Sequence, residues 1–159
     1  MRNMNKLVDL LIIDPQKDFV EKYGSLSVPG AKEDMQRLSF FVENNLTRFN
    51  NIRVSLDQHH PVHIAHANYW LNSNGDMPGD YTQITYKDVV SGKWHTRNPV
   101  LQTHAVAYLE ALEKAGKTHR IWPQHCLIGS VGATVEENLF NALLKWEEQF
   151  EMVDYVSKG

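Results

Sequence analysis

The sequence predicts an α/β fold in which helices cover both faces of a mainly parallel β-sheet, a three-layer arrangement. Two observations support this class. Short apolar segments rich in β-branched residues alternate along the chain with segments whose apolar residues recur every three or four positions. The predicted order is strand, helix, strand, loop, helix, strand, helix, strand, and such alternation is typical of parallel sheets joined by crossover helices.

The first half of the fold is predicted to be a strand–helix–strand unit. Residues 7–13 are apolar apart from Asp9, as expected of a central parallel strand that is covered on both faces. A helix is predicted to begin after Gly30 and to end at the asparagines of residues 50–51. Its buried face would consist of the apolar residues at helical spacing, namely Met35, Leu38, Val42, Leu46 and Phe49. The second strand follows and reaches Leu56.

Residues 64–102 are the least regular part of the chain, with several loop signals and no clean period. A segment of this length inside a domain is typical of a lid or an interface. The side chains of Trp70, Trp94 and His95 would then either cover a pocket or pack the segment onto the body of the protein.

The second half of the fold is predicted to contain two more helices and two more strands. Thr103 is expected to cap a helix, and residues 119–121 are expected to form the third strand. A capping box of Thr134 and Glu137 would start the last helix, and residues 151–156 would form the fourth strand.

The composition bounds the protein class. A chain of 159 residues has the length of one domain with a sizeable core, so residues 1–159 are predicted to form a single domain. A formal net charge of −3 without a basic run argues against nucleic acid as a partner. The start is too short and polar for a signal peptide, and no apolar run is long enough to span a membrane. With one cysteine, a reducing compartment is favoured, and we expect a cytoplasmic protein.

Residues suited to metal binding follow the second and third predicted strands. Asp57 and His59 come directly after the second strand, and side chains two apart on an extended backbone point the same way. A carboxylate and an imidazole make two ligands for a divalent ion, and residues 122–126, with His125, are the best source of a third. The alternative is a solvated, histidine-rich loop.

Two further polar residues, Asp14 and Lys158, follow the first and last predicted strands. The carboxyl ends of parallel strands lie on one edge of the sheet, where α/β proteins bind their ligands. Taken singly, Asp14 could be a turn residue and Lys158 an exposed terminal lysine. Their convergence with Asp57, His59 and His125 on one edge is stronger evidence for a functional site than any single motif.

These strand-end motifs resemble those of the nicotinamidases, a group of isochorismatase-like cysteine hydrolases with a Rossmann-type fold. The resemblance rests on four segments in the family's order, namely residues 14–19 (DPQKDF), Asp57-x-His59-x-x-x-His63, residues 122–126 (WPQHC) and residues 156–159 (VSKG). It implies hydrolysis of a small carboxamide, with nicotinamide converted to nicotinate and ammonia through a cysteine thioester. It also implies a place in pyridine nucleotide salvage.

The resemblance implies catalytic and substrate-binding roles. Asp14 and Lys158 would be the acid/base and cationic members of a Cys-Asp-Lys triad, while Phe19 and Trp122 would hold the pyridine ring between them. Hydrolysis through a thioester needs a thiolate, a group that takes its proton and a proton for the departing ammonia. A carboxylate beside an ammonium can meet these needs, because the ammonium keeps the carboxylate ionised and stabilises a nearby thiolate.

The resemblance also implies one divalent metal ion, commonly zinc, iron or manganese. Its ligands would be Asp57, His59 and His125. His63 would be a further ligand or lie next to one, since members of the family differ at this position. The ion would hold the ring nitrogen of the substrate and fix the amide against the nucleophile.

The chain departs from the family pattern at the nucleophile. The family's reactive cysteine follows the lysine strand, whereas the only cysteine here, Cys126, adjoins a supposed metal ligand. The resemblance therefore implies a reactive cysteine downstream of Lys158, in a domain of which residues 1–159 are a C-terminally incomplete part that lacks the last strands. The alternatives are a non-catalytic protein of the same fold that binds a metal or small molecule, and a hydrolase of another small amide. The oligomeric state stays open, a homo-oligomer included.

Overall fold

The computed structural model describes residues 8–159, so the expectations for the chain start and for Leu7 lie outside the described residues. The chain divides into two compact units. We call Met1–His59 with His125–Gly159 the sheet unit and His60–Gln124 the hairpin unit. The prediction of a single domain stays a prediction.

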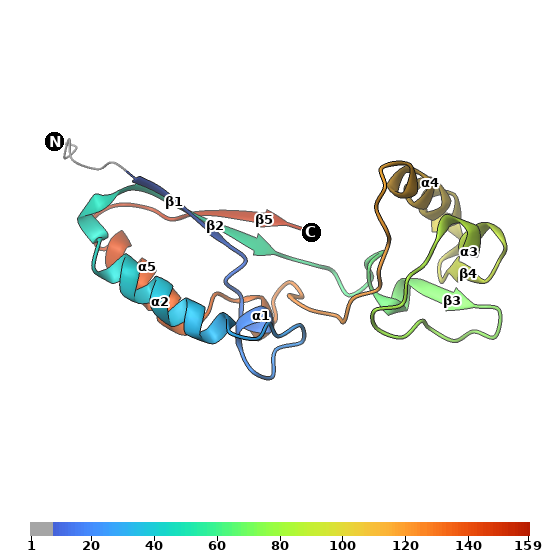
Figure 1. Cartoon of the computed structure of the whole chain (residues 1–159), viewed down its shortest axis with the longest axis horizontal. Coiled ribbons are helices and arrows are strands. Elements are labelled where there is room, and N and C mark those ends of the chain that lie inside the picture. Colours follow the sequence, from blue (N-terminus) through green and yellow to red (C-terminus); the bar gives the residue numbers. More distant parts are fainter. Residues whose placement is uncertain (1–7) are drawn as a thin grey trace. The chain divides into compact units, whose positions relative to one another are not determined.

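The sheet unit contains a parallel sheet in the order β1-β2-β5 (Figure 1). Its strands are β1 (Val8–Ile13), β2 (Phe49–Asp57) and β5 (Asp154–Lys158). Its helices are α1 (Lys17–Val20), α2 (Ala31–Glu43) and α5 (Glu137–Glu147), with short 3-10 turns at Leu46–Arg48 and Val131–Ala133. The α/β class with a parallel sheet is confirmed.

Helices α2 and α5 lie side by side on one face of this sheet (Figure 1). Val42 of α2 and Trp146 of α5 pack in one buried cluster with Ile12, Ile52 and Val54 of the strands. The alternation of a strand sends every second side chain to the other face. Within the described residues of the sheet unit no helix packs on that other face, so its cover stays a prediction.

Strand β1 therefore differs from the central, fully covered strand that its apolar run predicts. Leu10 and Ile12 face the helices, whereas Leu11 is 62% exposed and Ile13 is 67% exposed. Among the described strands β1 pairs only with β2 and forms one border of the sheet. An apolar run predicts burial on both faces, but the cover of each face depends on other parts of the chain.

The first long helix ends earlier than predicted. Helix α2 stops at Glu43, and Phe49 already begins β2, so residues 50–51 lie in the strand and do not end the helix. The Asp9 carboxylate of β1 accepts hydrogen bonds from Asn51 Nδ2 at 2.7 Å and Asn50 Nδ2 at 3.2 Å. Cross-strand partners thus stabilise polar residues that otherwise favour a turn.

The predicted caps of the later helices are also wrong. At the start of α5 it is Glu136 that caps, because its carboxylate accepts a hydrogen bond from the Leu139 N–H at 3.1 Å. The Thr134 hydroxyl instead donates to the Val131 carbonyl at 2.7 Å. Thr103 lies inside helix α4 (Gln102–Lys114) and does not cap it.

The hairpin unit is built on a short antiparallel pair, β3 (Trp70–Asn72) with β4 (Trp94–Thr96). It also contains α3 (Tyr86–Val90), α4 and 3-10 turns at Ala67–Tyr69 and Pro99–Leu101. Trp70 and Trp94 are buried in a cluster with Leu109 and Ile121, so they pack the unit's own core. The irregular segment therefore has regular elements.

The predicted third strand, residues 119–121, is not part of the parallel sheet. Arg120 forms an isolated antiparallel bridge with Gln83, and Trp122 forms an isolated parallel bridge with His66. These partners all belong to the hairpin unit.

None of the described helices has the length or the apolar character needed to cross a bilayer.

Candidate functional site

The carboxyl ends of the three parallel strands bring Asp14, Asp57 and Lys158 together. Asp14 follows β1, while Asp57 and Lys158 are paired neighbours at the ends of β2 and β5. The Asp14 backbone is left-handed, with φ of 50°, and its N–H still donates to the Ser55 carbonyl at 3.1 Å. Asp14 thus turns away from the strand direction while staying bonded to β2.

An ion pair joins two of these side chains. Lys158 Nζ lies 2.8 Å from Asp14 Oδ2 and 3.4 Å from Asp57 Oδ1. The Ser55 hydroxyl donates to Asp14 Oδ1 at 2.6 Å, which orients the carboxylate. Burial lowers the pKa of the Lys158 ammonium, but its hydrogen bond to Asp14 and the charge of Asp57 outweigh burial and raise the pKa above its ordinary value. The ammonium therefore stays charged at neutral pH.

Asp57 is also the centre of a buried cluster of possible metal ligands. Its Oδ2 lies 2.9 Å from His59 Nε2 and 3.0 Å from His125 Nε2. The two imidazole rings meet edge to face, with centroids 4.9 Å apart. The ligand atoms of the three residues lie within 4.8 Å of one another. The sequence prediction that these three side chains converge agrees with this geometry.

The cluster fits a divalent ion. Two ligands bound at about 2.0–2.1 Å in tetrahedral geometry lie roughly 3.3 Å apart, and the nitrogens around Asp57 Oδ2 lie slightly closer to it, at 2.9 and 3.0 Å. Burial raises the pKa of the Asp57 carboxyl, but the two histidines and the Lys158 ammonium outweigh it and hold the pKa well below its usual range. The carboxylate is therefore ionised at neutral pH, as a metal ligand must be.

Backbone hydrogen bonds hold the two histidine segments side by side. The His59 N–H donates to the Cys126 carbonyl, and the Ile128 N–H donates to the His59 carbonyl, both at 3.1 Å. The Cys126 backbone is left-handed, with φ of 48°, and its N–H donates to Asp18 Oδ2 at 2.6 Å. His125 is thus placed by its neighbour in the chain.

The Cys126 thiol is fully buried and unsuited to nucleophilic attack. Burial, together with the nearby carboxylates of Asp18, Asp57 and Asp14, raises its pKa to about 12. Thiolate, not thiol, is the attacking species, and at neutral pH this group stays protonated. The environment agrees with the expectation that Cys126 is not the nucleophile.

The remaining predicted residues fall in both units. The Phe19 ring, in the sheet unit, lies 5.4 Å from the His125 ring between centroids. Trp122 belongs to the hairpin unit, where it meets Tyr81 edge to face at 5.9 Å, and His63 belongs there too, 5.4 Å from His66. The sandwich of Phe19 and Trp122 and the metal role of His63 stay predictions.

Two residues at the site had no role assigned from the sequence. Gln16 is fully buried and its side-chain amide bonds to both backbone groups of Asp57. Asp18 accepts hydrogen bonds from the N–H groups of Cys126 and Ser25. Both stand in the segment 14–19 that carries the resemblance, but spacing alone does not reveal a side chain that bonds to the backbone of a distant residue.

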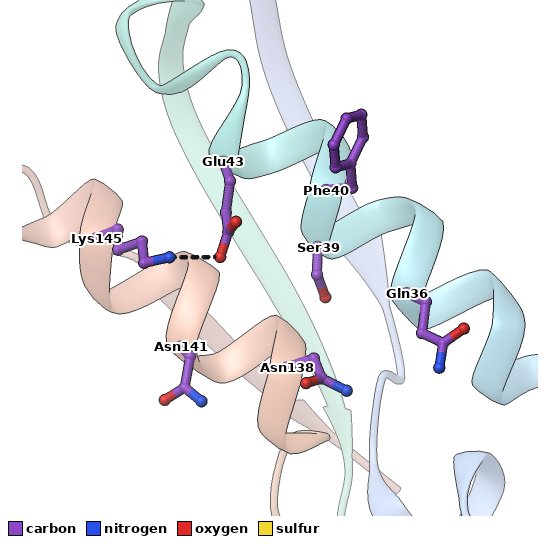
Figure 2. Close-up of a pocket in the computed structure, with 7 residues that line it drawn as sticks. All are labelled: Gln36, Ser39, Phe40, Glu43, Asn138, Asn141 and Lys145. Atoms are coloured by element: carbon purple, nitrogen blue, oxygen red, sulfur yellow. Dashed lines mark hydrogen bonds and ion pairs between the residues drawn. The ribbon is translucent and has the colours of Figure 1, made fainter.

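The sheet unit also has a groove of about 410 Å³ between α2 and α5 (Figure 2). Its lining is polar and includes an exposed ion pair of Lys145 Nζ and Glu43 Oε1 at 2.7 Å (Figure 2). None of the predicted site residues lines it. The groove therefore supplies matched control positions, such as Gln36 and Lys145.

Comparison with known proteins gives a consistent picture. No family model matches the chain. In sequence it is similar to the nicotinamidase of Saccharomyces cerevisiae, with 24% identity over 135 residues that make up 85% of this chain and 51% of that protein. The chain thus spans about half the length of this curated relative.

The structural comparison points the same way. The structure is similar to that of the yeast nicotinamidase, with a TM-score of 0.62 and 22% identity over 95% of this chain and 56% of that chain. It is also similar to the nicotinamidase/pyrazinamidase of Acinetobacter baumanii, with a TM-score of 0.57 and 16% identity over 99% of this chain and 54% of that chain. The chain therefore has the fold of these nicotinamidases, in agreement with the resemblance to nicotinamidases that its strand-end motifs carry.

Proposed function

We propose that the protein is a metal-binding hydrolase of a small carboxamide, and that it converts nicotinamide to nicotinate and ammonia. One observation carries the proposal. The cluster of Asp57, His59 and His125 and the ion pair of Asp14 with Lys158 lie at one edge of the sheet and share the Asp57 carboxylate. The similarity to nicotinamidases supports the substrate class.

In this proposal Asp57, His59 and His125 hold one divalent ion, which is zinc, iron or manganese. Carboxylate and imidazole ligands suit all three metals. When bound, the ion supplies a fixed point of attachment for the ring nitrogen of a pyridine carboxamide. Phe19, whose ring neighbours His125, contacts one face of the substrate ring.

The ion pair supplies the acid/base chemistry. The Lys158 ammonium pairs with Asp14 Oδ2 at 2.8 Å, and Asp14 accepts the proton of an attacking thiol and later donates it to the departing ammonia. The Ser55 hydroxyl holds the other carboxylate oxygen. The thiol of this proposal is not Cys126 but a cysteine that follows the strand of Lys158, and the intermediate is a thioester.

A second candidate function is favoured by the state of Cys126. With its thiol buried and its pKa raised to about 12, this cysteine offers no thiolate. A chain without a nucleophile and with the same cluster would bind a metal ion or a small molecule and not hydrolyse it. The two functions make opposite predictions for ammonia release.

The test measures zinc binding and ammonia release from nicotinamide by the native protein and by Asp14→Asn and Lys158→Met variants. A general acid/base group contributes about 10²–10⁴-fold to a rate, so each variant is expected to lose at least about 100-fold in turnover. A Lys145→Met variant, which removes an exposed lysine from an ion pair of similar length, should keep the native rate. Zinc binding without ammonia release would favour the binding function, and the absence of both would refute the proposal.

A further inference from the structure

The end of β1 leaves part of β2 without a strand beside it. The ladder between these strands reaches the pair Ile13 and Ser55, and the Asp14 N–H still donates to the Ser55 carbonyl. After Asp14 the chain leaves the sheet through Pro15. The N–H and C=O of Asp57 face the same side as those of Ser55, because residues two apart in a strand share a direction. Both groups thus point to the place where β1 has ended.

The Gln16 side chain occupies that place. Its Oε1 accepts the Asp57 N–H at 2.7 Å, and its Nε2 donates to the Asp57 carbonyl at 2.6 Å. The same nitrogen donates to the Ala133 carbonyl at 3.1 Å. The side chain is fully buried, so water does not compete for these bonds. A side-chain amide carries the same donor and acceptor as a peptide group, and here it bonds to Asp57 as a neighbouring strand would.

We infer that Gln16 is a positioning residue of the metal site. Its side-chain amide takes the place of the missing strand beside Asp57 and so holds the Asp57 backbone. The inference rests on the proposed function. On the other side of Asp57, the Gln58 N–H donates to the Lys158 carbonyl at 2.7 Å, so β5 holds the strand there. Without Gln16 the Asp57 backbone would be held from one side alone.

The position of the Asp57 backbone matters because one carboxylate oxygen serves both histidines. Asp57 Oδ2 is within 3.0 Å of the Nε2 atoms of His59 and His125, which come from different segments of the chain. A small rotation of the Asp57 backbone would move this oxygen away from both nitrogens at once. Loss of a group that orients a metal ligand typically costs about 10–100-fold in metal affinity.

The test compares Zn²⁺ affinity in the native protein, a Gln16→Met variant and a Gln36→Met control. Methionine is close to glutamine in size and has no amide, while Gln36 is an exposed glutamine of the α2–α5 groove (Figure 2). We expect the Zn²⁺ dissociation constant to rise about 10–100-fold in Gln16→Met and to stay unchanged in Gln36→Met. The visible spectrum of bound Co²⁺, which reports coordination geometry, should change only in Gln16→Met.

Equal Zn²⁺ affinity in folded Gln16→Met and native protein would overturn the inference and leave the proposed function intact. If the native protein binds no Zn²⁺, the proposed metal site fails, and the role of Gln16 fails with it. If Gln16→Met does not fold, amide hydrogen exchange of the native, metal-free protein decides. If Gln16 replaces a strand beside Asp57, the Asp57 amide should exchange as slowly as the ladder amides of β2. Rapid exchange of this amide would overturn the inference.

Discussion

The two units of the chain are organised in different ways. In the sheet unit, the direction of three parallel strands brings Asp14, Asp57 and Lys158 together, and His59 and His125 join them through contacts with Asp57. In the hairpin unit, large buried side chains such as Trp70 and Leu109 build a core around a short antiparallel pair. In the sheet unit the strand order brings the predicted site residues together, whereas the hairpin unit is organised by the packing of its apolar core.

This difference separates two kinds of sensitivity. Changes at the strand ends of the sheet unit should alter metal binding more than stability, because these polar side chains are not members of the hydrophobic cluster that packs the unit's core. Changes in the core of the hairpin unit should alter stability more than metal binding. The following predictions test this separation.

The largest effect is expected for Asp57→Ala. It removes the oxygen shared by His59 and His125 and should lower Zn²⁺ affinity by more than about 100-fold, the upper end of the cost of losing an orienting partner. Isothermal titration with Zn²⁺ measures the effect. The control is Asp154→Ala, which removes an exposed carboxylate paired with Arg53 at 3.2 Å. Equal metal content in the three proteins would contradict the metal site.

The next effect is one of stability in the hairpin unit. Leu109 is 1% exposed, and Leu109→Ala should destabilise this unit by about 2–5 kcal/mol through lost contacts and a cavity. Urea unfolding followed by hydrogen exchange in α4 measures it. The Zn²⁺ affinity of the still-folded variant should stay native, because the cluster belongs to the sheet unit. A parallel loss of Zn²⁺ affinity would show that the two units are not separate in this sense.

Acid is expected to lower the stability of each unit by a moderate amount, and over a different pH range in each. Burial lowers the pKa of the His119 imidazole below 6.5. The hydrogen bond to the Ile64 carbonyl raises the pKa and the charge of His63 lowers it, but burial is the largest effect. The unfolded chain therefore takes up a proton first, and stability from His119 is present above pH 6.5 and lost below it. In the sheet unit the pKa of Asp57 lies below 3.8, so its contribution is present above that pH and lost only in stronger acid.

Hydrogen exchange as a function of pH measures the two windows. Amides of α4 should lose protection below pH 6.5, before those of β2 do. His119→Gln should remove the early loss, whereas His104→Gln, at an exposed position of α4, should not. Loss of protection in both units over one window would contradict the assignment.

The smallest effect is expected for Cys126→Ser. The thiol is buried and protonated, so its replacement should change Zn²⁺ affinity and ammonia release by less than about tenfold, far from the several orders of magnitude expected for a nucleophile. Rates and metal content are measured on the same preparation. A loss of several orders of magnitude with unchanged metal content would identify Cys126 as the nucleophile after all.

The site was more predictable from the sequence than the element boundaries were. Asp57 and His59 converge because the period of a strand is a local property. The end of α2 was not predictable in this way, since Leu46 and Phe49 continue the helical spacing although they lie in a 3-10 turn and a strand. Pairing partners are long-range properties, which is why residues 119–121 were wrongly placed in the parallel sheet.

The left-handed backbone of Asp14 and Cys126 has a consequence for the mutations that each position would tolerate under selection. At φ of 50°, Asp14 occupies a region that glycine, asparagine and aspartate enter most easily. Asparagine can adopt this backbone conformation but lacks the negative charge that pairs with Lys158, and glutamate has the charge but adopts the conformation less easily. Only aspartate combines the two. At Cys126, with φ of 48°, the left-handed backbone conformation is the main requirement, and glycine adopts it readily. A saturation library should therefore retain one residue type at position 14 and several at position 126.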